Sequence, residues 1–457
     1  MPFRLHFQIH LTDDCNQRCL HCYSTNREYY LDREQFDHIL NEVLVYMESL
    51  AMVPGRAIFC GGEPTLSPIL LDCMRKCSKA GFRWISLLTN GMSMSPAFAR
   101  ELLKAGCTRA QICIEGARET HNAIRNGSWD QVLRAWETCR RIGLPVVNQT
   151  TLHPLNCGQV DEVVQICQGK VDHVSFLRHV PHERDLGILS PSQWMDVLRT
   201  IYLAYYRDGQ YENPFVSVKD IHWSHIFLTH TYHCDYMGRY PKTPIIDCNG
   251  DVYVCRRSNV VLGNVFRESL MDIFQTSKTL AQIRDRQNLN PRCRSCPRLD
   301  VCGGCRGMAL AVHGDMMAED PQCCLQEPSD GNTREFLRQK MNKMLPTFTG
   351  DISESFGKMF MKLNESLREF RSSSPTLRER RRIIRTAKKK GLSLSLREVQ
   401  RTVDNFRAAC GLNKAEDTKQ WLRSHRISLE QFQDYLTFSL IQDKVENRLK
   451  ASNGVPD

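Results

Sequence analysis

Residues 4–22, RLHFQIHLTDDCNQRCLHC, place three cysteines on a short loop directly after a predicted strand. The strand is indicated by apolar residues that alternate with polar ones. Cys15, Cys19 and Cys22 follow in a C-x3-C-x2-C spacing. Three thiolates on one loop can bind three irons of a 4Fe–4S cluster and leave the fourth iron without a protein ligand. Zinc matches this loop less well, because His21 stands in the wrong register and no further C-x2-C pair lies nearby.

Beyond this loop, short apolar runs alternate with helical patterns as far as about residue 180, as they do in a parallel α/β unit. We predict strands at 4–11, 56–60, 84–89, 110–114, 145–151 and 172–177. We predict helices at 33–50, 68–80, 96–105, 128–142 and 158–169. Six such units predict an α/β fold, a partial (β/α)6 barrel of the TIM type, with its chemistry at the carboxyl ends of the strands.

The second predicted strand ends in IFCGGEPTL (58–66), one strand–helix unit after the cysteine loop. Gly61 and Gly62 let the backbone approach a ligand closely, and Glu63 supplies a carboxylate for an ammonium group. With these two motifs in this order, the sequence resembles the radical S-adenosylmethionine superfamily. The resemblance implies that the GGE residues hold the amino end of S-adenosylmethionine.

The resemblance extends to three further segments, LLTNG (87–91), QICIEG (111–116) and THNAIRNGSW (120–129). It implies that S-adenosylmethionine is also contacted by Tyr23, Asn90, Cys113 and Arg125, with the arginine on the methionyl carboxylate. A capping role for the asparagine and a solvated position for the arginine remain open.

The chemistry implied is a reductive cleavage of S-adenosylmethionine that yields a 5′-deoxyadenosyl radical, which abstracts hydrogen from an unactivated carbon. The cofactor carries the difficult step, and the protein positions it and excludes water. The sequence does not identify a catalytic base. His153, His179, His182 and Glu183 lie near predicted strand ends, but we expect surface or structural roles for them.

A second cysteine-dense region contains Cys234, Cys248, Cys255, Cys293, Cys296, Cys302, Cys305, Cys323 and Cys324. With IIDCNGDVYVC (245–255) and LGNV (262–265), it resembles the SPASM extension of radical S-adenosylmethionine enzymes. The resemblance implies two auxiliary 4Fe–4S clusters, and so three clusters in the chain. It assigns to the first auxiliary cluster Cys234, Cys255 and Cys305. It assigns to the second Cys293, Cys296, Cys302 and Cys323.

Three of these cysteines leave alternatives open. Two residues separate Cys302 from Cys305, where the family usually has three. Cys248 is additional, and it either completes the first auxiliary cluster or leaves an iron open to substrate. Cys324 competes with Cys323 for the last position. One or two zinc ribbons are the alternative for the whole region.

The whole chain has 457 residues, 21 cysteines and a mean hydropathy of -0.41. We find no apolar run of membrane-spanning length and no signal peptide, so we expect a cytoplasmic protein. A reducing compartment disfavours disulfides, which leaves iron or zinc to explain the clustered cysteines. We interpret the remaining nine as mostly small buried hydrophobes: Cys60, Cys73, Cys77, Cys107, Cys113, Cys139, Cys157, Cys167 and Cys410.

The family resemblance also bears on the substrate. SPASM-bearing relatives mostly oxidise sulfatase active sites or form thioether and carbon–carbon crosslinks in ribosomally made peptides. In sulfatase-maturing relatives, the cysteine of the G-x4-C element is followed directly by an aspartate that acts as a base. Here Arg256 follows Cys255. We therefore predict a peptide maturase. There are two rival hypotheses. One is radical chemistry on a non-peptide metabolite, and the other is a non-catalytic electron carrier or RNA-binding scaffold.

The basic excess lies in the C-terminal quarter, because residues 331–457 hold 26 Lys and Arg against 15 Asp and Glu. The run RERRRIIRTAKKK (378–390) predicts a basic helix that is either solvated or a dock for an acidic leader peptide. Nucleic acid is disfavoured because no aromatic residues interleave with the basic ones. Residues 380–448 faintly resemble the helical peptide-holding parts of parvulin-type foldases.

These patterns divide the chain into four parts: a barrel (1–190), bridging helices (191–230), a turn-rich SPASM domain (231–328) and a basic helical domain (329–457). The expected partners are S-adenosylmethionine, a precursor peptide with an acidic leader, and a reductant such as flavodoxin or ferredoxin. We expect no membrane partner.

Overall fold

The computed structural model describes residues 4–24, 29–182, 186–205, 215–226, 241, 243–296, 299 and 302–323. Its main feature is a run of seven parallel strands that neighbour one another in chain order. They are β1 (Arg4–His10), β2 (Val53–Cys60), β3 (Trp84–Leu88), β4 (Arg109–Gln111), β5 (Val146–Leu152), β6 (His173–Arg178) and β7 (Val216–Val218). Because β7 forms an edge of the sheet and does not pair with β1, the barrel is open. The predicted partial α/β barrel is confirmed.

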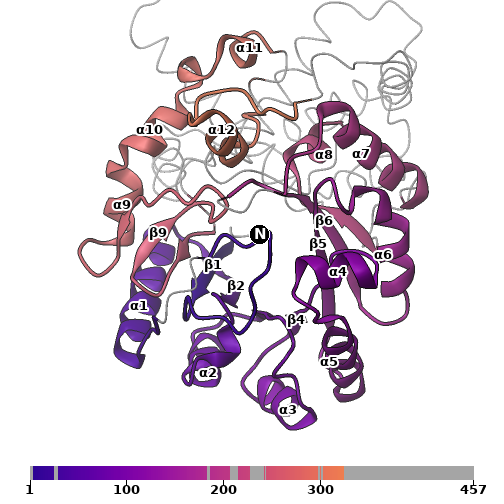
Figure 1. Ribbon diagram of the computed structural model, residues 1–457. Coiled ribbons are helices and arrows are strands. Elements are labelled where there is room, and N and C mark those ends of the chain that lie inside the picture. The colour runs from indigo at the N-terminus through magenta and orange to yellow at the C-terminus, as the bar shows by residue number, and fades with distance from the viewer. Residues whose placement is uncertain are drawn as a thin grey trace, which may run out of the picture. The chain divides into compact units, whose positions relative to one another are not determined.

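Helices cover the outer face of these strands (Figure 1). They are α1 (Arg33–Ser49), α2 (Leu70–Lys79), α3 (Pro96–Lys104), α4 (Arg118–Ile124), α5 (Trp129–Ile142) and α6 (Val160–Cys167). Local sequence fixes their ends. Asp32 and Gln35 form a capping box at the start of α1, and Gly143, with φ 80°, ends α5 in the left-handed conformation.

The core lies between the strands and these helices. In β1 the apolar residues Leu5, Phe7 and Ile9 are fully buried, and Phe36 of α1 stacks on Phe59 of β2 with ring centroids 6.3 Å apart. Several scattered cysteines also lie in buried positions, as we predicted for small hydrophobes. The buried ones are Cys60, Cys73, Cys77, Cys107, Cys113, Cys139 and Cys167. Cys157 is partly exposed, and Cys410 lies outside the described residues.

The segment predicted as bridging helices also contains a strand. It forms α7 (Pro191–Tyr205) and α8 (Ile221–Ile226), with β7 between them. The strand extends the parallel sheet by pairing with β6. Sequence analysis missed it because three residues, Val-Ser-Val, are too few to establish an alternating pattern.

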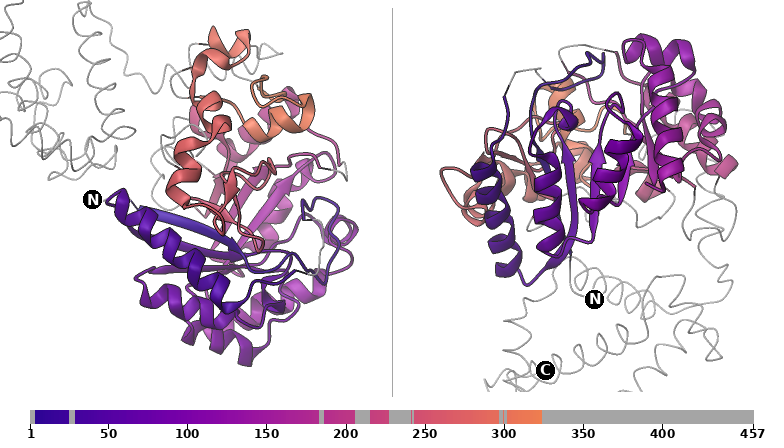
Figure 2. Two further views of the ribbon diagram at one scale, coloured as in Figure 1. Left: turned by 90° about the vertical axis from the view of Figure 1, so that its left-hand side faces the viewer. Right: turned by 90° about the horizontal axis from the view of Figure 1, so that it is seen from below.

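Residues 243–323 form a second part of the fold, joined to the sheet at β1. Its short strands are β8 (Ile245–Ile246), β9 (Asp251–Tyr253) and β10 (Gly263–Asn264), and β8 runs parallel to β1. Its helices are α9 (Leu270–Thr276), α10 (Lys278–Arg284), α11 (Pro291–Arg294) and α12 (Arg306–His313). Figure 2 shows them gathered at one side of the strands, in pink to orange.

This second part contains helices, although we predicted only a turn-rich domain there. Its helices have only four to eight residues, so they are too short to display a helical period in the sequence. The predicted basic helical domain at 329–457 lies outside the described residues. Among the described helices, none is long and apolar enough to cross a membrane.

Candidate functional site

The cysteine loop begins where β1 ends, at the carboxyl edge of the sheet. Cys15, Cys19 and Cys22 are all partly exposed. Burial, together with the neighbouring Glu63 and the other two thiols, raises the pKa of Cys15 to about 11. Backbone N–H groups of Gln17 and Ser24 donate to the sulfurs of Cys15 and Cys22, both at 3.4 Å. Because a bound cation is needed to hold such thiols as thiolates, this donor set fits an iron–sulfur cluster.

A single metal ion, unlike a cluster, needs several ligand side chains gathered around one point. No three or more His, Cys, Asp and Glu side chains of the described residues are gathered closely enough to hold one ion.

The two glycines at the end of β2 lie against the chain itself. Gly61 has φ 148°, and a Cβ there would lie 2.2 Å from the carbonyl oxygen of Thr12. A Cβ on Gly62 would lie 2.1 Å from the carbonyl oxygen of Asp14. Gly62 N–H donates to Thr12 O at 2.8 Å, which ties the end of β2 to the cysteine loop. The chain itself fills the space that a side chain would need, and a contact between the backbone of these glycines and a ligand stays a prediction.

Glu63 is a buried carboxylate, 1% exposed. Its Oε1 accepts from Thr65 N–H, Thr65 Oγ1 and Thr89 Oγ1, and its Oε2 accepts from Asn90 N–H at 2.7 Å. All these donors are neutral, and burial raises the pKa of Glu63. A buried carboxylate without a cation is costly, so this group fits a ligand that brings an ammonium.

Asn90 connects the end of β3 to the cysteine loop. Its Nδ2 donates to Asn16 Oδ1 at 2.6 Å, and its Oδ1 accepts from Met92 N–H at 3.0 Å. The second contact is the local capping role that we left open. Cys113, at the end of β4, is buried, and burial raises its pKa.

Arg125 is ion-paired and does not lie on a solvated face. Its Nε and Nη2 donate to Glu115 Oε1 at 2.8 and 2.5 Å, and the Glu115 side chain is fully buried. Thr151 N–H donates to the other carboxylate oxygen at 2.8 Å, and His21 Nε2 lies 3.6 Å from Oε1. This pairing orients the guanidinium beside the cysteine loop. Sequence reasoning missed Glu115, although it stands in the quoted QICIEG segment.

Tyr23 follows the cysteine loop and contacts the second part of the fold. The guanidinium of Arg256 lies 5.5 Å from its ring centroid and 4.3 Å from that of Tyr253. Arg256 is 8% exposed, and its Nε has no hydrogen-bond partner in the described part of the chain. Its charge adds to burial in lowering the pKa of the nearby His10 to about 3. The residue after Cys255 therefore reaches the ring beside the cysteine loop.

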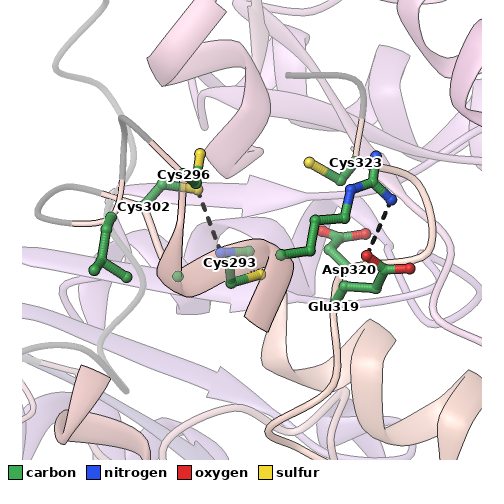
Figure 3. A pocket seen from close by; sticks show the side chains of 10 residues that line it. Cys293, Cys296, Cys302, Glu319, Asp320 and Cys323 are labelled. Carbon is green, nitrogen blue, oxygen red and sulfur yellow. Dashed lines mark hydrogen bonds and ion pairs between the residues drawn. The ribbon is translucent and has the colours of Figure 1, made fainter. Parts of the chain in front are cut away.

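Cysteines of the second region line a pocket together (Figure 3). They are Cys293, Cys296, Cys302 and Cys323, the four that the resemblance assigns to the second auxiliary cluster. Burial, with Cys323 and Cys296 nearby, raises the pKa of Cys302 to about 12. Gly304 N–H donates to Cys302 Sγ at 3.3 Å. Four thiols around one cavity are the donor set of a fully ligated 4Fe–4S cluster.

The first auxiliary set is only partly described. Burial raises the pKa of Cys305, and the nearby Asp320 and Cys255 add to this shift. Cys248 is fully buried in the hydrophobic core. Cys234 and Cys324 lie outside the described residues.

A buried ionic network lies next to Cys305. Arg178, at the end of β6, donates through Nη1 and Nη2 to both oxygens of Asp320 at 3.0 and 2.9 Å, and through Nε to Asp220 at 2.7 Å. Asp320 Oδ2 accepts from the backbone N–H of Cys305 at 2.9 Å.

Two of the residues considered as catalytic bases, His153 and His179, are buried, with ring centroids 6.2 Å apart. Glu183 lies outside the described residues.

Family models match both halves of this site. Residues 9–167 match the Radical SAM superfamily, and residues 238–297 match SPASM, an iron–sulfur cluster-binding domain.

Curated relatives include enzymes with two kinds of substrate. The AdoMet-dependent heme synthase of Methanosarcina barkeri is 26% identical over 344 residues, which are 68% of this chain and 94% of that protein. The PqqA peptide cyclase of Methylocella silvestris is 25% identical over 307 residues, which are 63% of this chain and 79% of that protein.

Solved structures share the fold. Streptococcus suis SuiB bound to precursor peptide SuiA has a TM-score of 0.56 and 16% identity, covering 72% of this chain and 77% of that one. The anSMEcpe enzyme with bound AdoMet and Cp18Cys peptide has a TM-score of 0.58 and 17% identity, covering 75% of this chain and 98% of that one.

Proposed function

We propose that this chain, a radical S-adenosylmethionine enzyme with a SPASM domain, acts on a ribosomally made precursor peptide. It abstracts hydrogen from the peptide and forms a thioether or carbon–carbon crosslink or a related oxidation. The relatives named PqqA peptide cyclase support a peptide substrate, as does the fold shared with a SuiB structure that holds its precursor peptide. The site observation that carries the radical chemistry is the buried carboxylate of Glu63 near the cysteine loop, for which the described residues provide no cation.

The residues at the carboxyl edge receive the following proposed roles. Cys15, Cys19 and Cys22 bind a 4Fe–4S cluster, which when bound supplies the electron that cleaves S-adenosylmethionine. Glu63 holds the ammonium of the methionyl group, and Arg125, oriented by Glu115, holds its carboxylate. Further contacts come from Tyr23, Asn90 and Cys113, and from the backbone at Gly61 and Gly62.

We extend the proposal to two auxiliary clusters. Cys293, Cys296, Cys302 and Cys323 bind one around their common pocket. Cys255 and Cys305 bind the other together with Cys234, and Cys248 is the candidate for its fourth ligand. We also propose the domain limits 1–190, 191–230, 231–328 and 329–457, with the last domain binding the leader of the peptide. The reductant is a flavodoxin or ferredoxin, and the location is the cytoplasm.

The test is anaerobic co-expression with a candidate precursor peptide, followed by mass spectrometry. We expect the peptide to lose hydrogen in multiples of two and to stimulate formation of 5′-deoxyadenosine. The triple variant Cys15→Ala/Cys19→Ala/Cys22→Ala is the control and should leave the peptide unchanged. An unchanged peptide with the active enzyme, while 5′-deoxyadenosine forms with a small molecule, contradicts a peptide substrate.

A second candidate function is radical chemistry on a small tetrapyrrole-like carboxylate. It is favoured by the curated heme synthase, which aligns with this chain over 94% of its own length. The two candidates separate cleanly, because one predicts peptide-dependent and the other porphyrin-dependent cleavage of S-adenosylmethionine.

A further inference from the structure

The strands present two different faces. In β1 the fully buried Leu5 and Phe7 alternate with the partly exposed His6 and Gln8. Because successive side chains of a strand point to opposite faces, the second set faces the interior of the open barrel. The same alternation and the strand register place further polar residues on this interior face. They are Arg56, Ser86, Arg109, Gln111, Gln149, Ser217 and Lys219.

Three of these interior residues are cations from three different strands. Arg109 Nε donates to Ser86 Oγ at 3.1 Å, and Lys219 Nζ donates to Gln149 Oε1 at 2.5 Å. The buried Nε of Arg56 has no hydrogen-bond partner among the residues that the structure describes. Among the described residues no carboxylate forms an ion pair with any of the three, and no interior position of the described strands carries Asp or Glu.

The three charges act on one another. The pKa of Lys219 is lowered to about 8, mainly by burial and further by the charges of Arg109 and Arg56. The pKa of Arg109 is lowered to about 10, mainly by burial and further by the charge of Arg56. Arg56, Arg109 and Lys219 are only partly exposed, and like charges held close together disfavour one another's charged forms. Within the part of the chain that the structure describes, the cluster therefore has no carboxylate partner.

We propose that the barrel interior binds carboxylate groups of the substrate through Lys219, Arg109 and Arg56. This inference rests on the proposed function and narrows its substrate class to molecules with at least two carboxylates. Lys219 directly follows β7 at its carboxyl end, and it interacts electrostatically with Cys113, one of the residues proposed to contact S-adenosylmethionine. Arg56 pairs in register with the first residue of β3, so its backbone lies deeper in the barrel. The carboxylates come either from acidic side chains of a peptide or from acidic groups of a small molecule.

Equilibrium binding tests this without turnover, using the reconstituted full-length enzyme with S-adenosylmethionine. One probe pair is a blocked peptide with two glutamates and the same peptide with glutamines. The other is a porphyrin tetracarboxylate and its tetra-amide. We expect the acid form of at least one pair to bind about tenfold or more tightly than its neutral partner, and the pair that does so identifies the source of the carboxylates.

Variants assign the binding to these residues. Lys219→Met and Arg109→Gln should each weaken binding of the acid probe about tenfold or more, whereas Lys219→Arg should retain it. The exposed Lys79→Met and Arg134→Gln are matched controls that should change nothing. Because each interior variant removes a charge that has no carboxylate partner among the described residues, its melting temperature should not fall, which separates lost binding from misfolding.

Equal binding of acid and neutral probes, or equal loss in the interior and control variants, overturns the proposal. This result is distinguishable from failure of the peptide hypothesis, because the binding assay requires no reaction, and the co-expression assay requires no assumption about carboxylates.

Discussion

Replacing Arg178 with methionine should strongly destabilise the chain. Its side chain and that of Asp320 are each 1% exposed, and the guanidinium also pairs with Asp220, which is 3% exposed. Removal of the arginine leaves two buried carboxylates without their cation, and breaking a buried pair in this way costs about 3–5 kcal/mol. We expect the free energy of unfolding, measured by urea denaturation at neutral pH, to fall by that amount.

The chain offers a matched control for this prediction. Arg118 pairs with Asp130 at 2.8 Å, but these side chains are 50% and 56% exposed. Exposed pairs contribute about 0–1 kcal/mol, so Arg118→Met should change the free energy of unfolding by no more than that. If Arg178→Met also costs less than about 1 kcal/mol, the network does not stabilise the fold in the way argued here.

Three further predictions follow from the site. Glu63→Gln should weaken binding of S-adenosylmethionine about tenfold or more while cluster iron is retained, measured by equilibrium dialysis with labelled ligand; unchanged binding would exclude an ammonium contact. Gly62→Ala should destabilise the fold by about 3 kcal/mol or more, because its Cβ would clash with the Asp14 carbonyl at 2.1 Å, whereas Gly158→Ala, with nothing within 4 Å, should be tolerated; denaturation curves that coincide would contradict this. Because burial and nearby cations lower the pKa of Lys219 to about 8, its charge is lost as pH rises through 8, so acid-probe affinity should fall between pH 7 and 9 in the wild type but not in Lys219→Arg; identical pH profiles would rule out a titrating lysine.

The barrel could be predicted because its signals are local. In β1 the alternation of Leu5, Phe7 and Ile9 with polar residues sets both the strand and its buried face. The short β7 could not be predicted, because its place depends on pairing with β6 and its three residues carry little pattern of their own.

The candidate site also has some features that could be predicted from the sequence and others that could not. The resemblance to the SPASM extension assigned four thiols to one cluster, and these four line one pocket in the structure. The pairing of Arg125 with Glu115 joins residues ten apart through the end of β4, and the contact between Arg256 and Tyr23 joins two parts of the fold. Contacts of this kind depend on the tertiary arrangement, which spacing along the chain does not encode. The cationic barrel interior emerges only when the register of several strands is known.

The central claim is our proposal that the chain binds three 4Fe–4S clusters, one at the carboxyl ends of the strands and two in the SPASM part. Iron and sulfide per chain after anaerobic reconstitution measure this most directly. We predict about 12 iron atoms for the wild type and about 8 for Cys15→Ala/Cys19→Ala/Cys22→Ala. A wild-type value near 4 that vanishes in the triple variant would contradict the auxiliary clusters.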